Sequence, residues 1–330
     1  MNTFYDTDAA RGILNAYLAK CYQDGGSTPF LPLLAAEDVE VDRFSNPDCW
    51  RLTSTGDGDV EEVQVRIPGI LCRSMLPPIT RKLSAKDKST IRSLRQFVKI
   101  TGLGSHVYGE IQKKMQEIEL IFRNALPEHT PKPMVFHEYK GEYAIDVHCR
   151  YFTDRRVAPM MKHEGFLNGV DPEHRLEVAR GDDSVHGVEN VVQYLQVLTD
   201  EEGKERYEEV TPSSFKNGDV VEARVAFICY PLYEGGCKIV PTLRSLILLS
   251  NQVREVHASI KTFGGLANTG VRAQAAAKRL QEMHQADLSA ERGGQRGSGV
   301  RRGRCVKTLK RKFIEINYGS SDMKEDMGDM

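Results

Sequence analysis

No apolar run among the 330 residues approaches the ~20 residues that a membrane-spanning helix needs. The first twenty residues also lack the basic and apolar regions of a secretory signal peptide. Cysteine is sparse: the seven thiols are an odd number and include no CxxC pair. We therefore expect a soluble intracellular protein with free thiols and without a membrane partner. A disulfide between Cys229 and Cys237, which flank one hairpin loop, is the less favoured alternative.

Sequence motifs for catalysis are also missing. The chain has no P-loop, no GxGxxG after a strand, and no HExxH or GxSxG. GDGD at 56–59 resembles the start of a calcium loop, but Ile67 occupies the twelfth position, where such a loop needs glutamate. Histidines are densest between 129 and 186, without metal-ligand spacing. We predict no metal, no cofactor and no enzyme, and a site among these histidines is the weaker alternative.

Helical periodicity dominates the first part of the chain. Apolar residues recur at helical spacing in 9–21, where Asp6 or Asp8 is a plausible N-cap, and again in 84–100 and 105–126. A hairpin with its turn at GDGD lies between the first two of these helices. The proline-rich stretch 127–133 ends the last helix and indicates a domain boundary.

After this boundary the apolar period changes from 3.6 to 2. Hairpins are predicted over 134–152, 190–211 and 217–251, which gives about six strands in an antiparallel meander. We predict an α+β protein with an antiparallel β-rich central domain, either a small barrel or a sandwich. The predicted units are a mixed N-terminal part (1–128), the β-rich domain (129–256) and a helical, basic C-terminal extension (257–330).

The hairpin at 217–251 is apolar on one face and amphipathic on the other. Arg224, Tyr230, Lys238 and Arg244 lie on the amphipathic face, together with apolar side chains. One interpretation is a solvated surface on which Glu222 pairs across the strands. The other is a binding surface, on which cations contact phosphates and aromatic rings stack on bases.

The string PSSFKNGDVVEARVAFICYPL…LRSLILL in this hairpin resembles a segment of uncharacterised proteins from basidiomycete fungi. That resemblance covers about 130–250 and implies no established function. The hairpin is also distantly similar to the long hairpin of OB-fold single-strand-binding proteins, which implies a small barrel that binds single-stranded nucleic acid.

The segment 291–312 is rich in arginine, lysine and glycine and is followed by an acidic end. Flexible arginines can adapt to a phosphate chain. The candidate residues of this segment are Arg292, Arg296, Arg301, Arg302 and Arg304. The cluster KTLKRK within it also fits a nuclear localisation signal, which favours the nucleus over the cytoplasm. A solubilising linker is the alternative.

Together these features predict a binding protein that contacts single-stranded DNA or RNA through the hairpin and the basic segment. Duplex recognition is not favoured, because no helix carries a cluster of base-reading side chains. The alternative is a protein-interaction module that uses the same amphipathic face for a protein partner or for self-association.

Overall fold

The structure, a computed structural model, describes residues 1, 5–56, 59–81, 83–84, 87–199, 205–256 and 311–314. The predicted C-terminal helix, most of the basic segment and the acidic end lie outside the described residues. Arg292, Arg296, Arg301, Arg302 and Arg304 therefore also lie outside them. In the described part of the chain, no helix is both long and apolar enough to cross a bilayer.

Five strands close into a barrel at the centre of the molecule. They are β4 (Gln64–Met75), β5 (Arg95–Thr101), β8 (Glu142–Arg150), β13 (Val220–Pro231) and β14 (Cys237–Ser250). Each neighbouring pair is hydrogen-bonded in the order β4-β5-β8-β14-β13, and β13 returns to β4. The β8–β14 pair is parallel and the others are antiparallel. This α+β architecture with a closed five-stranded barrel is OB-like, and the prediction of an α+β, β-rich fold is confirmed.

Alternation along the strands produces the barrel interior. Val98 and Ile100 of β5 and Val147 of β8 are fully buried, whereas the residues between them are partly exposed. Successive side chains in a strand point to opposite faces, so each strand contributes one apolar row to the core. Burial of each large side chain contributes about 1.5–3 kcal/mol.

Further strands extend the barrel sheet at its margins. They are β1 (Glu40–Ser45), β2 (Asp48–Gly56), β3 (Asp59–Glu62), β6 (Pro131–Lys132), β7 (His137–Tyr139), β11 (Gln193–Thr199) and β12 (Glu205–Glu209). The strands β9 (Thr153–Asp154) and β10 (Ser184–Val185) form a separate small sheet. The four predicted hairpin turns join paired strands as expected: β2–β3, β7–β8, β11–β12 and β13–β14. A further hairpin, β1–β2, was not predicted.

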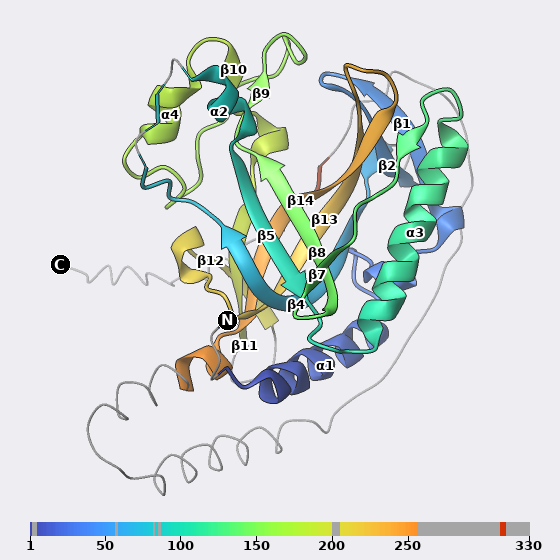
Figure 1. Cartoon of the computed structure of the whole chain (residues 1–330), viewed down its shortest axis with the longest axis vertical. Helices are drawn as coiled ribbons and strands as arrows, with labels where there is room; N and C mark the ends of the chain where they lie inside the picture. Colours follow the sequence, from blue (N-terminus) through green and yellow to red (C-terminus); the bar gives the residue numbers. More distant parts are fainter. Residues whose placement is uncertain are drawn as a thin grey trace, which may run out of the picture.

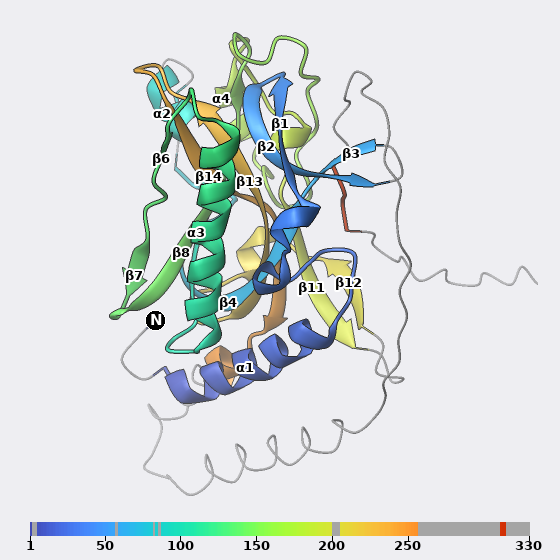
Figure 2. The same cartoon turned by 90° about the vertical axis from the view of Figure 1, so that its right-hand side faces the viewer.

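Two long helices cover parts of the barrel (Figure 2). In α1 (Thr7–Gln23), Asp6 is the N-cap and accepts a hydrogen bond from the Ala9 amide. This helix contacts β4 and β13, while α3 (Val107–Ala125) contacts β8, β1 and β6. Both helices bury the apolar stripes that their sequences predict. The short helices are η1 (Leu31–Leu33), η2 (Ala36–Asp38), α2 (Lys88–Ser93), α4 (Arg175–Arg180), η3 (Val188–Asn190) and η4 (Pro212–Ser214).

Three expectations about the fold need correction. The predicted helix over 84–100 is a short helix, α2, followed by strand β5. Alternation of Gln96, Val98 and Ile100 suits a strand, and pairing with both β4 and β8 outweighs the local helical spacing. The sheet is not an antiparallel meander, because β14 pairs in parallel with β8 and β11. A division at residue 128 would also cut the barrel, since β4 and β5 precede it.

Candidate nucleic-acid interface

Arg244, one of the predicted contact residues, is buried and ion-paired. Its side chain is 1% exposed, and its Nε donates to Glu62 Oε1 at 2.8 Å. Arg51 lies beside it and donates from Nη1 to Glu62 Oε2 at 2.7 Å and to Glu189 Oε2 at 2.8 Å. Residues 188–190 and 311 cover this part of the sheet. Arg244 also donates a hydrogen bond to the Glu189 carbonyl, and Arg311 donates one to the Val188 carbonyl. The expectation that Arg244 lies on an exposed face is wrong.

Arg224 is half-buried rather than solvated. Its Nε lies 3.4 Å from Oε1 of the buried Glu222, and its guanidinium lies 5.5 Å from the centre of the Tyr207 ring. Glu222 also accepts from Arg66 Nε at 2.8 Å and from Tyr17 of α1 at 3.1 Å. The expected exposure of Arg224 is therefore not observed, because α1 and β12 cover this end of the hairpin. Glu222 forms ion pairs with Arg66 and Arg224, but it is buried, so the interpretation of this face as a solvated surface is also wrong here.

Tyr230 and Lys238 remain near the surface at the other end of the hairpin. They are register partners across β13 and β14; Lys238 is exposed and Tyr230 half-buried. The guanidinium of Arg150, at the end of β8, lies 5.6 Å from the centre of the Tyr230 ring. This contact joins the end of the hairpin to the outer surface of β8.

The outer surface of β5 and β8 collects further cations and rings. In the antiparallel register Arg95 lies opposite Arg150, and Phe97 lies opposite His148. These four side chains point away from the barrel core, since the residues between them along each strand are buried. We define the β5–β8 face as these four residues with the two hairpin residues: Arg95, Phe97, His148, Arg150, Tyr230 and Lys238. Figure 1 shows β5 and β8 side by side in front, with the labelled helices at the margins.

Charge on this face is unbalanced. Among the described residues, no carboxylate lies within ion-pair distance of Arg95, Arg150 or Lys238; in contrast, Lys99 pairs with Asp146 at 3.3 Å. Burial, followed by the nearby Arg150, lowers the pKa of Arg95, and the Arg95 Nε has no hydrogen-bond partner. An arginine held next to another cation is stabilised by an anion that supplies the missing countercharge.

The pKa of His148 reflects the same excess of positive charge. Burial and then Arg95, Arg150 and Lys238 lower its pKa from 6.5 to about 4. Burial also lowers the pKa of His186 to about 4, although its Nδ1 lies 2.8 Å from the Tyr151 carbonyl oxygen. Both imidazoles are therefore neutral in the folded protein at neutral pH.

These shifts predict a loss of stability in mild acid. Because the folded pKa lies below the unfolded value, the unfolded chain binds more protons between pH 6.5 and 4. The free energy of unfolding should fall as pH decreases through this window, with His148 contributing about 1–2 kcal/mol by pH 5 after allowance for solvent screening. Urea unfolding at pH 7.5 and pH 5 checks this. His148→Gln should lose less stability between the two pH values than the unmodified chain; an equal loss would contradict the assignment.

The position of the face within the barrel matters for its chemistry. Numbered in chain order, β5 and β8 are the second and third barrel strands, and the loops β4–β5 and β13–β14 adjoin them. One of these loops joins β13 to β14 and carries Tyr233, which is fully exposed. At the end of β4, beside the other loop, Met75 is 53% exposed. A flexible chain that crosses the face would meet cations and rings in turn.

The sequence missed most of this face for an identifiable reason. A helix over 84–100, which its spacing predicts, would not place Arg95 in a strand beside β8. His148 and Arg150 alternate with buried residues along β8, but no local pattern identifies the strands next to β8. The detectable signal was the alternation of Arg95, Phe97 and Lys99 with apolar or buried residues.

The histidine-rich stretch does not assemble a metal site within the described residues, since no three His, Cys, Asp or Glu side chains come together there as ligands. His163 and His186 are neighbours, with ring centroids 6.5 Å apart. His186 packs against Phe166 and Phe152. In this surrounding it is a core histidine.

A scan against protein-family models found no match, and a search of curated proteins also found none. Among solved structures, the chain is similar to gp2.5, a single-stranded DNA-binding protein encoded by bacteriophage T7. The match has a TM-score of 0.28 and 14% identity, and it covers 71% of this chain and all of that one. The single-stranded DNA-binding protein of bacteriophage Enc34 matches with a TM-score of 0.28 and 10% identity, over 64% of this chain and 88% of that one. A likeness of this extent carries no functional argument. The resemblance to basidiomycete proteins stays a prediction.

Proposed function

We propose that this protein binds single-stranded nucleic acid on the β5–β8 face. The observation that carries the proposal is a cluster of three cations, Arg95, Arg150 and Lys238, beside Phe97 and Tyr230. These cations have no carboxylate partner in the part of the chain that the structure describes. Cations without countercharge favour a polyanion, and aromatic rings stack on unpaired bases at about 1–3 kcal/mol per base.

The arrangement favours a single strand over a duplex. Strands of the barrel form the face. The rings of Phe97 and Tyr230 lie on it next to the cations. In a duplex the bases are stacked on one another and their faces are closed to such rings. A single strand exposes both phosphates and base faces, so it uses both kinds of group.

The residues Arg292, Arg296, Arg301, Arg302 and Arg304 extend this proposal to the C-terminal segment. They follow β14 along the chain and would add phosphate contacts to those of the face. Nuclear localisation through KTLKRK is a separate proposal, tested by the cellular distribution of the chain with and without that cluster.

The test is a fluorescence-anisotropy titration of labelled single- and double-stranded oligonucleotides at several salt concentrations. We expect single strands to bind more tightly than duplexes. Affinity should fall with salt, with a slope of log K against log salt of about −0.7 for each phosphate neutralised. Equal affinity for duplex, or affinity that salt does not change, would contradict the proposal.

A protein-interaction module is the second candidate function. The exposed side chains of Met75 and Tyr233 favour it, because methionine and tyrosine are enriched in protein–protein interfaces. A protein complex formed mainly by apolar contacts would respond little to salt, and it would form without nucleic acid. The same titration series separates the two functions.

A further inference from the structure

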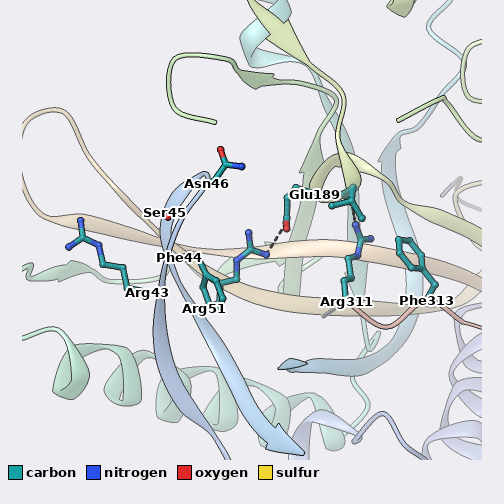
Figure 3. A pocket seen from close by; sticks show the side chains of 9 residues that line it. Arg43, Phe44, Ser45, Asn46, Arg51, Glu189, Arg311 and Phe313 are labelled. Atoms are coloured by element: carbon teal, nitrogen blue, oxygen red, sulfur yellow. Dashed lines mark hydrogen bonds and ion pairs between the residues drawn. The ribbon is translucent and has the colours of Figure 1, made fainter. Parts of the chain in front are cut away.

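A cavity of about 550 Å³ lies beside Arg51 (Figure 3). One wall is the tip of the β1–β2 hairpin, with Phe44 and Asn46. The opposite wall contains Glu189, Arg311 and Phe313, and Arg51 lies between the two walls. Pockets that bind small molecules typically measure about 300–1,000 Å³. The cavity is therefore large enough for a small organic ligand.

The side chains behind this cavity carry an excess of positive charge. Within the described residues, the guanidinium groups of Arg51, Arg244 and Arg311 cluster with two carboxylates, those of Glu62 and Glu189. The two carboxylates bond Arg51 and Arg244. Among the described residues, none lies within ion-pair distance of Arg311, which bonds carbonyl oxygens instead, such as that of Val191 at 2.6 Å.

Arg311 is thus a cation that the cluster does not neutralise. Burial, followed by the nearby Arg244, lowers its pKa to about 10, and its Nε has no hydrogen-bond partner. An anion in the adjacent cavity would supply the missing negative charge. Glu189 on the same wall provides a hydrogen-bond acceptor, and the Asn46 amide on the opposite wall provides both a donor and an acceptor.

The segment that carries Arg311 is held in place by side-chain amides. Gln193 makes two hydrogen bonds to the backbone of Ile314, at 3.2 and 3.0 Å. Gln64 donates to the Lys312 carbonyl at 3.0 Å. These bonds fix the direction of Arg311 and of Phe313, whose ring centre lies 4.8 Å from the Arg311 guanidinium. A cation and an aromatic ring are therefore presented together at one wall.

We propose that this cavity binds a nucleoside monophosphate, with its phosphate at Arg311 and its base against Phe313 or Phe44. A flat ring matches the two phenylalanines that line opposite walls. Amino groups of the base or hydroxyls of the sugar can donate to Glu189. The site differs from the β5–β8 face in its residues, and the inference does not depend on the function proposed for that face.

The experiment is isothermal titration of the full-length chain with adenosine monophosphate, adenosine and inorganic phosphate. We expect the nucleotide to bind more tightly than either part alone. Arg311→Gln should weaken nucleotide binding about tenfold or more, as for loss of a charge-assisted contact. Phe313→Ala should weaken it as well, without changing the response to inorganic phosphate.

Lys312→Gln is the matched control. It removes a cation from the same segment, but the Lys312 side chain pairs with Glu61 and does not line this cavity. Its nucleotide affinity should stay within about twofold of the unmodified chain. No nucleotide binding, equal affinity for nucleotide and phosphate, or equal weakening by Arg311→Gln and Lys312→Gln would overturn the inference.

A second variant separates this site from the β5–β8 face. Lys238→Gln should weaken oligonucleotide binding and leave the nucleotide affinity unchanged. Arg311→Gln should weaken nucleotide binding even when no oligonucleotide is present. If Lys238→Gln weakens nucleotide binding as much as Arg311→Gln does, the nucleotide occupies the face and the cavity assignment is wrong. If a variant loses oligonucleotide binding but keeps its nucleotide affinity, the result tests only the function proposed for the β5–β8 face.

Discussion

Glu62→Gln should lower the free energy of unfolding by about 3–5 kcal/mol, the cost of leaving a buried charge without its partner. Glu62 is 1% exposed and accepts hydrogen bonds from both Arg51 and Arg244. Burial raises its pKa, but Arg244 and Arg51 outweigh burial and hold the pKa below its ordinary value. Glutamine keeps the shape and removes the charge, so three guanidinium groups would then face Glu189 alone. Urea unfolding monitored by circular dichroism measures the change.

Glu61→Gln is the control for this prediction. Glu61 is the neighbouring residue and pairs with Lys312, whose side chain is 58% exposed. Loss of such a surface pair should cost less than about 1 kcal/mol. If the two variants lose the same stability, the buried cluster does not depend on charge balance in the way that its geometry indicates.

The second large effect concerns binding. Replacing Arg95, Arg150 and Lys238 together by glutamine should lower the affinity for a single-stranded oligonucleotide about a hundredfold or more at low salt. The slope of log K against log salt should become shallower by about 2, since three phosphate contacts at about 0.7 each are lost. The triple variant should fold normally, because these cations have no carboxylate partners among the described residues. Fluorescence anisotropy across a salt series measures both quantities.

A matched triple variant provides the control. Lys20, Lys113 and Arg123 are exposed cations on α1 and α3, outside the β5–β8 face. Their replacement by glutamine changes the net charge by the same amount. We expect a much smaller loss of affinity, caused only by the weaker overall field. Equal losses in the two triple variants would mean that net charge, and not this face, governs binding.

Local periodicity was enough to predict several elements of the fold. The apolar stripe of α3 lies at helical spacing, and its six buried residues are the ones that this spacing selects: Val107, Tyr108, Ile111, Met115, Ile118 and Phe122. The turns of the hairpins follow from glycine and polar residues between alternating strands, as at Lys140 and Gly141. These features depend on residues close together in the sequence.

Local periodicity failed where two patterns overlap. Ile91, Leu94 and Val98 fit a helix, while Gln96, Val98 and Ile100 fit a strand, and the second pattern is the one used beyond Ser93. The choice depends on β4 and β8, which supply hydrogen-bonding partners on both sides of β5. Val147 lies opposite Val98 but 49 positions later in the chain. No local window contains that information.

The sequence by itself determined that this protein is an α+β chain with a β-rich centre and with cations on its long hairpin. Only the tertiary structure decided which cations have a countercharge. Arg244 is buried and forms an ion pair with Glu62, which lies 182 positions away in the chain. Arg150 instead packs against the Tyr230 ring and has no carboxylate partner among the described residues. The physical reason is that an ion pair depends on distance in space, and closure of the barrel sets that distance.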